Sequence, residues 1–151
     1  MGVLAKSKTL VLECTINNVE ALPENNLGDR VRKLRVSNNI TINDLSKYCN
    51  ISTDTISNIE HNRTTPNIST INKISQALNT SNAYLLGVDK WPESTSGEII
   101  YKYRMIAGLS QRQLAEKCNL HYSTIKDYEN DKISNPDTLK IIYNQISYDK
   151  K

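Results

Sequence analysis

The sequence predicts an all-α protein made of two tandem copies of one small helical module, with four to five short helices in each copy. Apolar residues recur three and four positions apart, as at Ile42, Leu45 and Cys49, which is the spacing of one face of a helix. The stretch Thr41–Glu60 also returns, 69 positions later, as Ser110–Glu129. Glycine and proline are scarce, at 5 and 4 residues, while asparagine, isoleucine and serine are abundant, which suits short, capped helices.

The repeat stays in register over many positions. The matched pairs are Leu45/Leu114, Cys49/Cys118, Asn50/Asn119, Thr55/Thr124, Ile56/Ile125 and Glu60/Glu129, with Gly28/Gly97, Lys33/Lys102 and Arg35/Arg104 upstream. A repeat of 69 positions is a whole small domain rather than one unit of a solenoid. At roughly 55 to 60 residues, each copy is near the lower size limit for folding alone without a metal or a disulfide.

Two short helices lie inside the repeated stretch, on either side of a break at Asn50-Ile51. Thr41 and Ser52 stand where the N-caps of these helices belong, so each helix has its own start signal. Helices of about two turns with so short a connection cross steeply, as in a helix-turn-helix. In the second copy Ser110 and Gln113 predict a capping box at the start of the corresponding helix.

The charge of the chain is only mildly basic. The 151 residues carry a formal net charge of +3, with −1 over residues 1–26, +3 over residues 27–90 and +1 over residues 91–151. A bias of this size does not by itself identify a polyanionic partner.

The cysteines and the hydropathy pattern indicate in which cellular compartment the protein is expected. Cys14, Cys49 and Cys118 form no CxxC pair and no Cys/His cluster, so we expect buried thiols in a reducing cytosol. No apolar run approaches the ~20 residues of a membrane span, and the N-terminus has no signal-peptide core. We therefore expect a cytoplasmic protein that does not contact a membrane.

Residues 1–26 are predicted as an N-terminal arm, either a strand or disordered. Thr9–Ile16 is β-branched and apolar, so it fits a strand or an arm that packs on a partner, and a frayed terminus is the other interpretation. Residues 27–87 form the first predicted domain, residues 88–96 a linker, and residues 97–151 the second domain. We expect Trp91, in the linker, to pack against a module because of its size.

Further helices complete each predicted domain. In the first, Leu27, Val31 and Leu34 line one face of the opening helix, and Thr65-Pro66 predicts an N-cap followed by proline at the start of a fourth helix. A short fifth helix is expected at Asn82–Leu86. The second domain has Asn135-Pro136 at the start of its last helix and no clear fifth helix. The open face left there must be covered by the first module, by residues 1–26 or by a second subunit.

These motifs resemble the Cro/lambda-repressor-like helix-turn-helix family, also called the XRE family, in two tandem copies. The residues that carry the resemblance are Leu34-Arg35, Leu45-Ser46, Thr55–Ser57 and Glu60–Arg63 in the first copy, and Tyr103-Arg104, Leu114-Ala115, Thr124–Lys126 and Glu129–Lys132 in the second. The resemblance implies a short recognition helix that enters the major groove of double-stranded DNA. It also implies ion pairs between Arg35 and Glu60 and between Arg104 and Glu129, which tie the first helix to the end of the recognition helix.

With Ile56 and Ile59 facing inward, the opposite side of the recognition helix carries the base-reading positions that the resemblance implies. These are Thr53, Asp54, Ser57 and Asn58, and in the second copy Tyr122, Ser123, Lys126 and Asp127. The candidate backbone contacts are Thr41, Asn43, His61, Asn62 and Arg63, with Arg112, Asn130 and Lys132 in the second copy. In the family a glutamine opens the helix before the turn and contacts DNA; Gln111 fits this pattern and Ile42 departs from it.

The leading hypothesis is a sequence-specific, double-stranded DNA-binding transcriptional regulator, a repressor of the phage or mobile-element type. The alternative is an antitoxin-like or adaptor protein in which one helix-turn-helix has turned to protein contacts, in a homodimer or with another partner. We expect neither an enzyme nor a cofactor or metal, since the only histidines are His61 and His121 and no phosphate-binding glycine loop is present. The linker can span about 30 Å, so one chain is expected to read two unlike half-sites.

Overall fold

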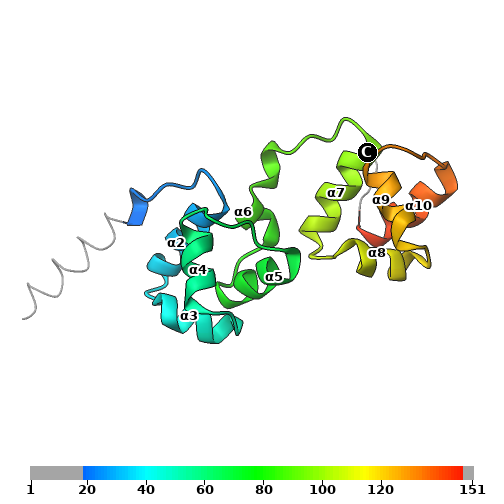
Figure 1. The fold of residues 1–151 in the computed structure, drawn as a ribbon. Coiled ribbons are helices and arrows are strands. Elements are labelled where there is room, and N and C mark those ends of the chain that lie inside the picture. Colours follow the sequence, from blue (N-terminus) through cyan, green and yellow to red (C-terminus); the bar gives the residue numbers. More distant parts are fainter. Residues whose placement is uncertain (1–18, 148–151) are drawn as a thin grey trace, which may run out of the picture. The chain divides into compact units, whose positions relative to one another are not determined.

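The computed structural model describes residues 19–147, so the predicted strand or arm at Thr9–Ile16 lies outside the described residues. Within the described part the chain has nine α-helices, a short 3-10 helix and no strand, which confirms the all-α prediction. The helices are α2 (Leu27–Ser37), α3 (Ile42–Cys49), α4 (Thr53–Glu60), α5 (Ile68–Ala77), α6 (Asn82–Leu86), α7 (Ser96–Ile106), α8 (Gln111–Cys118), α9 (Tyr122–Glu129) and α10 (Pro136–Gln145), with the 3-10 helix η1 at Val88–Lys90. Figure 1 shows their order along the ribbon.

The helices belong to two compact units, residues 1–65 and residues 66–151. The first unit holds α2, α3 and α4, and the second holds α5 to α10. The boundary between the units falls inside the first predicted domain, while the predicted division at residues 88–96 stays a prediction.

In the first unit α4 packs against both α2 and α3. The side chains of Val31, Leu45 and Ile56 are fully buried, as the three- and four-residue spacing predicts. Gly28 lies where α2 crosses the end of α4, and a Cβ on it would collide with the carbonyl oxygen of Ile59. Only glycine therefore permits this close helix crossing.

The predicted break between the two helices of each motif is confirmed. Asn50 ends α3 in the left-handed conformation, with φ 51°, and Asn119 ends α8 in the same way, with φ 52°. Asparagine adopts this conformation more readily than other residues with a side chain. The side chain of Ser52 then accepts a hydrogen bond from the Thr55 amide, so only three residues separate α3 from α4.

The second unit begins with α5, whose start differs from the prediction. The N-cap is Asn67, whose side chain accepts from the Thr70 amide, and not Thr65, so Pro66 precedes the helix instead of opening it. The side-chain oxygen of Asn67 reaches the amide of the third helical residue, so Asn67 determines where α5 begins. At α10 the predicted start is confirmed, with Asn135 as the N-cap and Pro136 as the first helical residue.

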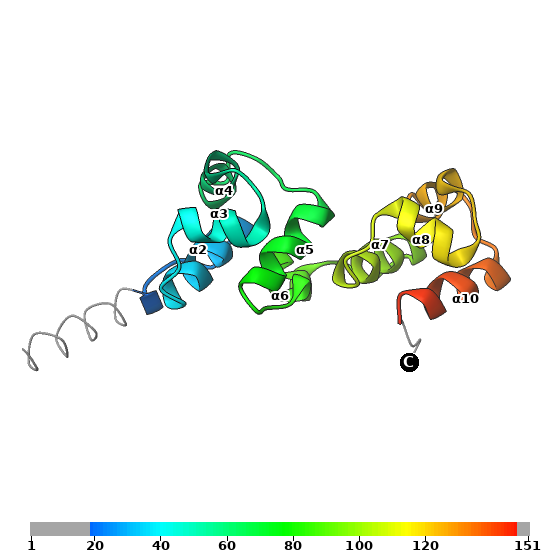
Figure 2. The ribbon, with the colours of Figure 1, turned by 90° about the horizontal axis from the view of Figure 1, so that it is seen from below.

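The second copy packs around one apolar core from α7 to α10. Its buried members are Ile100, Leu114, Ala115, Cys118, Ile125, Tyr128, Ile142 and Ile146. Figure 2 shows α10 beside α8, which it contacts. In the part of the chain that the structure describes, α10 is the last helix, and Ile133 and Ile141 in this region are 42% and 45% exposed.

The predicted linker is folded onto α7 and is not an extended tether. Val88 is buried in η1, and the Trp91 ring stacks on Tyr101 with 5.4 Å between ring centroids, which confirms that Trp91 packs against a module. The Lys102 ammonium donates to the Trp91 carbonyl at 3.3 Å and pairs with Glu93 at 2.8 Å. The ~30 Å span of an extended nine-residue linker is therefore not available in this structure.

The same arrangement precedes the first copy, so the repeat extends upstream. Residues 19–26 and residues 88–95 are named the lead-in segments. In each, a backbone bond closes a turn, from the Leu22 amide to the Val19 carbonyl and from the Trp91 amide to the Val88 carbonyl. Lys33 pairs with Glu24 at 2.6 Å, as Lys102 pairs with Glu93. Residues 88–95 are thus a structural part of the second copy.

Two asparagines bind α5 and α6 to the second copy. The side-chain amide of Asn72 donates to the Gly108 carbonyl at 2.8 Å, and the side-chain amide of Asn82 donates to the side-chain oxygen of Asn72 at 2.7 Å. Gly108 has φ +70°, and a Cβ there would collide with the Asn72 side chain. Helix α6 also packs against α7. Helices α5 and α6 therefore form one body with the second copy, through a contact that we call the asparagine latch.

Candidate DNA interface

Two helix-turn-helix motifs, α3–α4 and α8–α9, present the candidate recognition helices α4 and α9. Each recognition helix buries one side. Ile56 and Ile59 are buried in α4, and Ile125 and Tyr128 are buried in α9. The polar residues on the other side are therefore free of the core, as required for a helix that enters a DNA groove.

The candidate base-reading residues of α4 divide into two pairs. Thr53 and Asp54, in the first turn, are exposed, while Ser57 and Asn58, one turn later, are half-buried. Thr53 and Asp54 are therefore the more accessible of the four. They also stand in the N-terminal turn, whose residues contact base edges in this class of motif.

The candidate backbone contacts of the first copy lie at the two ends of the motif. Thr41 is the N-cap of α3, and its hydroxyl donates to Asp44 at 2.6 Å in a capping box, so it already has a structural role. Asn43, His61 and Arg63 are exposed. The His61 ring lies 2.7 Å from the Ser57 carbonyl, which holds it over the last turn of α4.

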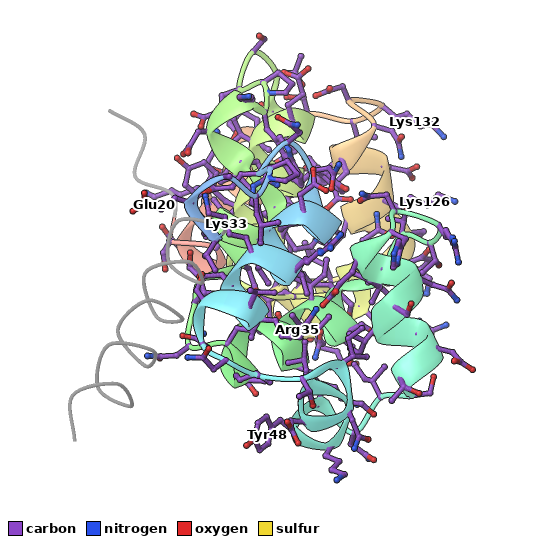
Figure 3. All side chains as sticks on the ribbon, turned by 90° about the vertical axis from the view of Figure 1, so that its left-hand side faces the viewer. Glu20, Lys33, Arg35, Tyr48, Lys126 and Lys132 are labelled. Atoms are coloured by element: carbon purple, nitrogen blue, oxygen red, sulfur yellow. The ribbon has the colours of Figure 1, made fainter. Side chains whose placement is uncertain are left out.

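In α9 the candidate residues Tyr122, Ser123 and Lys126 are exposed and Asp127 is half-buried. In Figure 3, Lys126 of α9 and Lys132 of the loop that follows it point outward, and Tyr48 of α3, 68% exposed, does the same. Lys132 lies 3.7 Å from Asp127, with side chains 65% and 40% exposed, so this pair is weak and open to exchange for a phosphate.

The two predicted ion pairs are present, and both are buried and bidentate. Arg35 contacts both oxygens of Glu60, at 2.6 and 2.9 Å, and its third nitrogen donates to the Ile40 carbonyl. Arg104 does the same with Glu129, at 2.5 and 3.2 Å, and donates to the Leu109 carbonyl. These contacts fix the C-terminal end of α4 to α2 in the first copy and the C-terminal end of α9 to α7 in the second.

Gln111, the glutamine that matches the family pattern, is half-buried and donates from its side-chain nitrogen to Glu129 at 2.6 Å. In the first copy Ile42 stands in its place and has no side-chain donor. The glutamine therefore extends the buried ion pair in the second copy and is held at the start of α8, beside α9.

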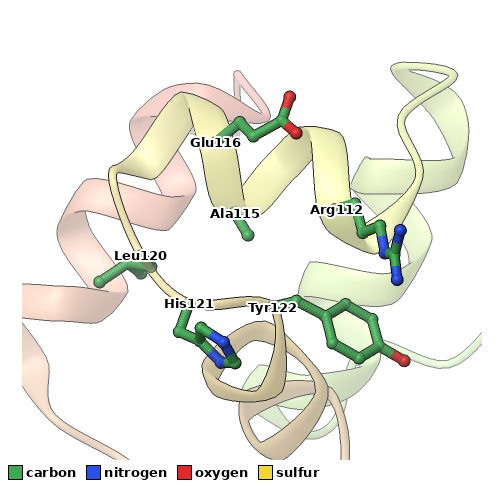
Figure 4. A pocket seen from close by; sticks show the side chains of 6 residues that line it. All are labelled: Arg112, Ala115, Glu116, Leu120, His121 and Tyr122. Atoms are coloured by element: carbon green, nitrogen blue, oxygen red, sulfur yellow. The ribbon is translucent and has the colours of Figure 1, made fainter.

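A surface hollow of about 410 Å³ lies between α8 and α9. Its lining residues are Arg112, Ala115, Glu116, Leu120, His121 and Tyr122. Figure 4 shows Ala115 in the middle, with Arg112 and Tyr122 close together at one end. The Arg112 guanidinium lies 5.8 Å from the Tyr122 ring centroid, within the range of a cation–π contact.

Other kinds of site have little support among the described residues. Cys49 and Cys118 are buried, and burial raises the pKa of the Cys118 thiol, which keeps it protonated. In residues 19–147 no cluster of three or more His, Cys, Asp or Glu is placed to hold a metal ion. None of the described helices has the length and apolarity needed to cross a membrane.

Sequence reasoning missed four contacts. His121 is the N-cap of α9, through a bond from the Ser123 amide to its ring nitrogen, and Gln111 binds Glu129. The lead-in ion pairs were also missed, although a signal for them existed. Leu22-Pro23-Glu24 and Trp91-Pro92-Glu93 stand 69 positions apart, the same offset as the rest of the repeat.

A comparison with protein-family models finds the helix-turn-helix family HTH_3 twice, over residues 31–85 and 100–142. These matches contain both candidate recognition helices and both buried ion pairs. No curated protein and no solved structure matches the chain. Domains of this family imply DNA binding and transcriptional regulation. Since the two matches cover more than half of its residues, the chain belongs to the Cro/lambda-repressor-like (XRE) helix-turn-helix family, with two copies of the domain.

Proposed function

We propose that the protein is a sequence-specific, double-stranded DNA-binding regulator that acts as a repressor, of the type found in phages and mobile elements, and that both copies read DNA. The observation that carries the proposal is the matched pair of recognition helices. Each buries two apolar residues, is fixed at its end by a buried ion pair, and exposes polar side chains in its first turn.

The two reading surfaces are chemically different, so we propose that one chain recognises two unlike half-sites. Helix α4 offers small polar groups and a carboxylate at Thr53 and Asp54, whereas α9 offers an aromatic ring and an ammonium at Tyr122 and Lys126. Lysine and asparagine have defined partners on base edges, while serine and threonine are permissive. A site for a single chain is therefore not a simple palindrome.

The repressor role rests on the resemblance to the lambda-type repressors and on simple occupancy. A protein that binds a promoter through two modules blocks the DNA that a polymerase would use, without a further activity. The modest net charge of +3 predicts moderate, salt-sensitive affinity, because backbone contacts release counterions.

The experiment is selection of binding sites from random duplex DNA by the full chain, followed by measurement of affinity for the selected and a scrambled duplex. Asn58→Ala and Lys126→Ala should each weaken the selected duplex by ~1–3 kcal/mol and change the preferred base. Lys140→Ala, which removes the same charge from the exposed side of α10, is the matched control for Lys126 and should leave the preference unchanged.

Arg63→Ala separates affinity from readout. As an exposed backbone contact it should weaken the selected and scrambled duplexes alike and reduce the slope of log affinity against log salt by about 1. Equal losses on both duplexes for Asn58→Ala and Lys126→Ala would remove these residues from the base-reading set. A chain that retards no duplex at moderate salt would overturn the proposal.

A second candidate function has one observation in its favour. Ile133 and Ile141, in the second copy, are large apolar side chains with 42% and 45% exposure, which suits contact with another protein. We therefore keep the adaptor or antitoxin-like role as the alternative, with the second copy as the protein-binding part. DNA footprints that stay unchanged when Tyr122, Ser123 and Lys126 are all replaced by alanine in the full chain would favour it.

A further inference from the structure

We propose that the hollow between α8 and α9 receives the edge of a thymine base, led by its 5-methyl group, and that Tyr122 is a specificity-determining residue of the second copy. The inference rests on the proposed function, since it requires α9 to lie in the major groove. Beyond that function, it predicts that the half-site contacted by α9 contains a thymine.

The hollow lies at the N-terminal end of α9. It is bordered by Tyr122, the first residue of α9, and by His121, the N-cap of that helix. The N-terminal residues of a recognition helix in this class of motif contact base edges, while the preceding helix crosses the backbone. The hollow therefore opens at the end of α9 that meets the bases.

The chemistry of the hollow's lining also suits a thymine methyl group. Ala115 is buried and Leu120 half-buried, so the inner surface is apolar, and the Tyr122 ring forms a wall. In the major groove the thymine methyl is the apolar group that base pairs present, and alanine and aromatic side chains are its usual contacts.

Contacts with neighbouring side chains hold Tyr122 in place. The His121 ring lies 2.8 Å from the Ser123 hydroxyl and accepts from the Ser123 amide at 3.3 Å, which fixes the start of the helix that carries Tyr122. The Arg112 guanidinium lies over the ring at 5.8 Å. A ring held in this way presents its surface to an incoming group with little loss of side-chain freedom.

The first copy lacks these features at the equivalent positions. Asn43, Ser46 and Thr53 stand where the second copy has Arg112, Ala115 and Tyr122. The Ser46 hydroxyl donates to the Ile51 carbonyl at 2.6 Å, so a polar group lies where Ala115 offers a methyl. Thymine reading through a hollow is therefore a property of the second half-site alone.

The test uses the full chain and its selected duplex, with each thymidine of the site replaced in turn by deoxyuridine, which lacks only the methyl group. One position in the half-site protected by α9 should bind roughly threefold to fivefold more weakly, the effect expected for one buried methyl. 5-Bromodeoxyuridine at that position should restore affinity, because bromine is close to a methyl group in size.

Variants assign the effect to the hollow. Tyr122→Ala should bind the thymidine and deoxyuridine duplexes equally, Tyr122→Phe should keep the difference, and Lys140→Ala, on the exposed side of α10, should leave the difference unchanged. A duplex that binds well but shows no uridine-sensitive position, or a difference that survives Tyr122→Ala, overturns this inference and leaves the proposed function intact. Absence of all duplex binding overturns both.

Discussion

In both copies an arginine near the end of the first helix pairs with the glutamate that ends the recognition helix, and a glycine in the first helix lets the two helices cross closely. These are Arg35, Glu60 and Gly28 in the first copy and Arg104, Glu129 and Gly97 in the second. Around this shared frame the exposed residues differ. The ion pair and the close crossing at the glycine fix the direction of the recognition helix in both copies. The exposed residues are left to decide what each copy contacts.

Three differences set the copies apart. Gln111 extends the buried ion pair of the second copy, whereas Ile42 opens the same helix in the first. Gly108 admits the asparagine latch, while the equivalent Asn39 is exposed, with φ 55°. Tyr122 borders a hollow where the first copy has Thr53. The second copy thus has contacts to α5 and α6 and a distinct surface at the start of its candidate recognition helix.

The largest expected effect tests the shared ion pair. Glu60→Ala leaves Arg35 buried without its partner and should cost ~3–5 kcal/mol in the free energy of unfolding. Glu129→Ala should cost at least as much, because it also removes the acceptor of Gln111. Chemical denaturation measures both. Glu24→Ala is the control, since that partner of Lys33 is 42% exposed and its loss should cost less than about 1 kcal/mol. Equal losses for Glu24→Ala and Glu60→Ala would contradict burial of the pair.

The next effect tests the close helix crossing. Gly28→Ala and Gly97→Ala place a methyl group against the backbone of the recognition helix, at the Ile59 carbonyl in one copy and 2.6 Å from the Glu129 carbonyl in the other. Overpacking of this kind costs about 1–3 kcal/mol. Thermal denaturation of each variant gives the comparison. A gain in stability, as helix propensity alone predicts for alanine, would show that the two helices can move apart at no cost.

A smaller effect tests the asparagine latch, which only the second copy has. Gly108→Asn installs the residue of the first copy and should break the bond from Asn72, a loss of about 0.5–1.5 kcal/mol. Asn39→Gly, the reverse exchange, is the matched control and should have little effect on this contact. Asn72→Ala should cost a similar amount, and the double variant should cost no more than either single variant. Fully additive losses would show that Asn72 and Gly108 are not coupled.

The smallest effect distinguishes the capping boxes of α3 and α8 by pH. The hydrogen bonds from Thr41 hold the pKa of Asp44 below its ordinary value of 3.8, whereas the capping box of α8 uses Gln113, which does not titrate. A lowered pKa contributes stability that is present above the ordinary pKa and is lost as the pH falls through the lowered value. Amide hydrogen exchange in α3 should therefore speed up relative to α8 below about pH 4. In Asp44→Asn this relative change should disappear, and its persistence would exclude Asp44 as the cause.

Local signals in the sequence were sufficient for the helices and the turns. Ser52 and Ser110 as N-caps and Asn50 at the break were predicted correctly, because capping and left-handed turns depend on residues within three or four positions of each other. The repeat also predicted the alignment of Arg35 with Arg104. Where two caps competed the prediction failed, since Thr65 and Asn67 both precede α5 and only the folded chain decides between them.

By itself, the sequence determined the all-α class, the two copies and the buried side of each recognition helix, since these follow from helical spacing and from a repeat in register. Only the tertiary structure decided that the predicted linker folds onto α7, that Gln111 binds Glu129 and that Asn72 reaches Gly108. These partners lie 11, 18 and 36 positions apart. These contacts depend on how helices pack and leave no periodic pattern along the chain. The Arg35–Glu60 pair, 25 positions apart, could be predicted because the family resemblance implied it, whereas the patterns read from the sequence did not mark these three contacts.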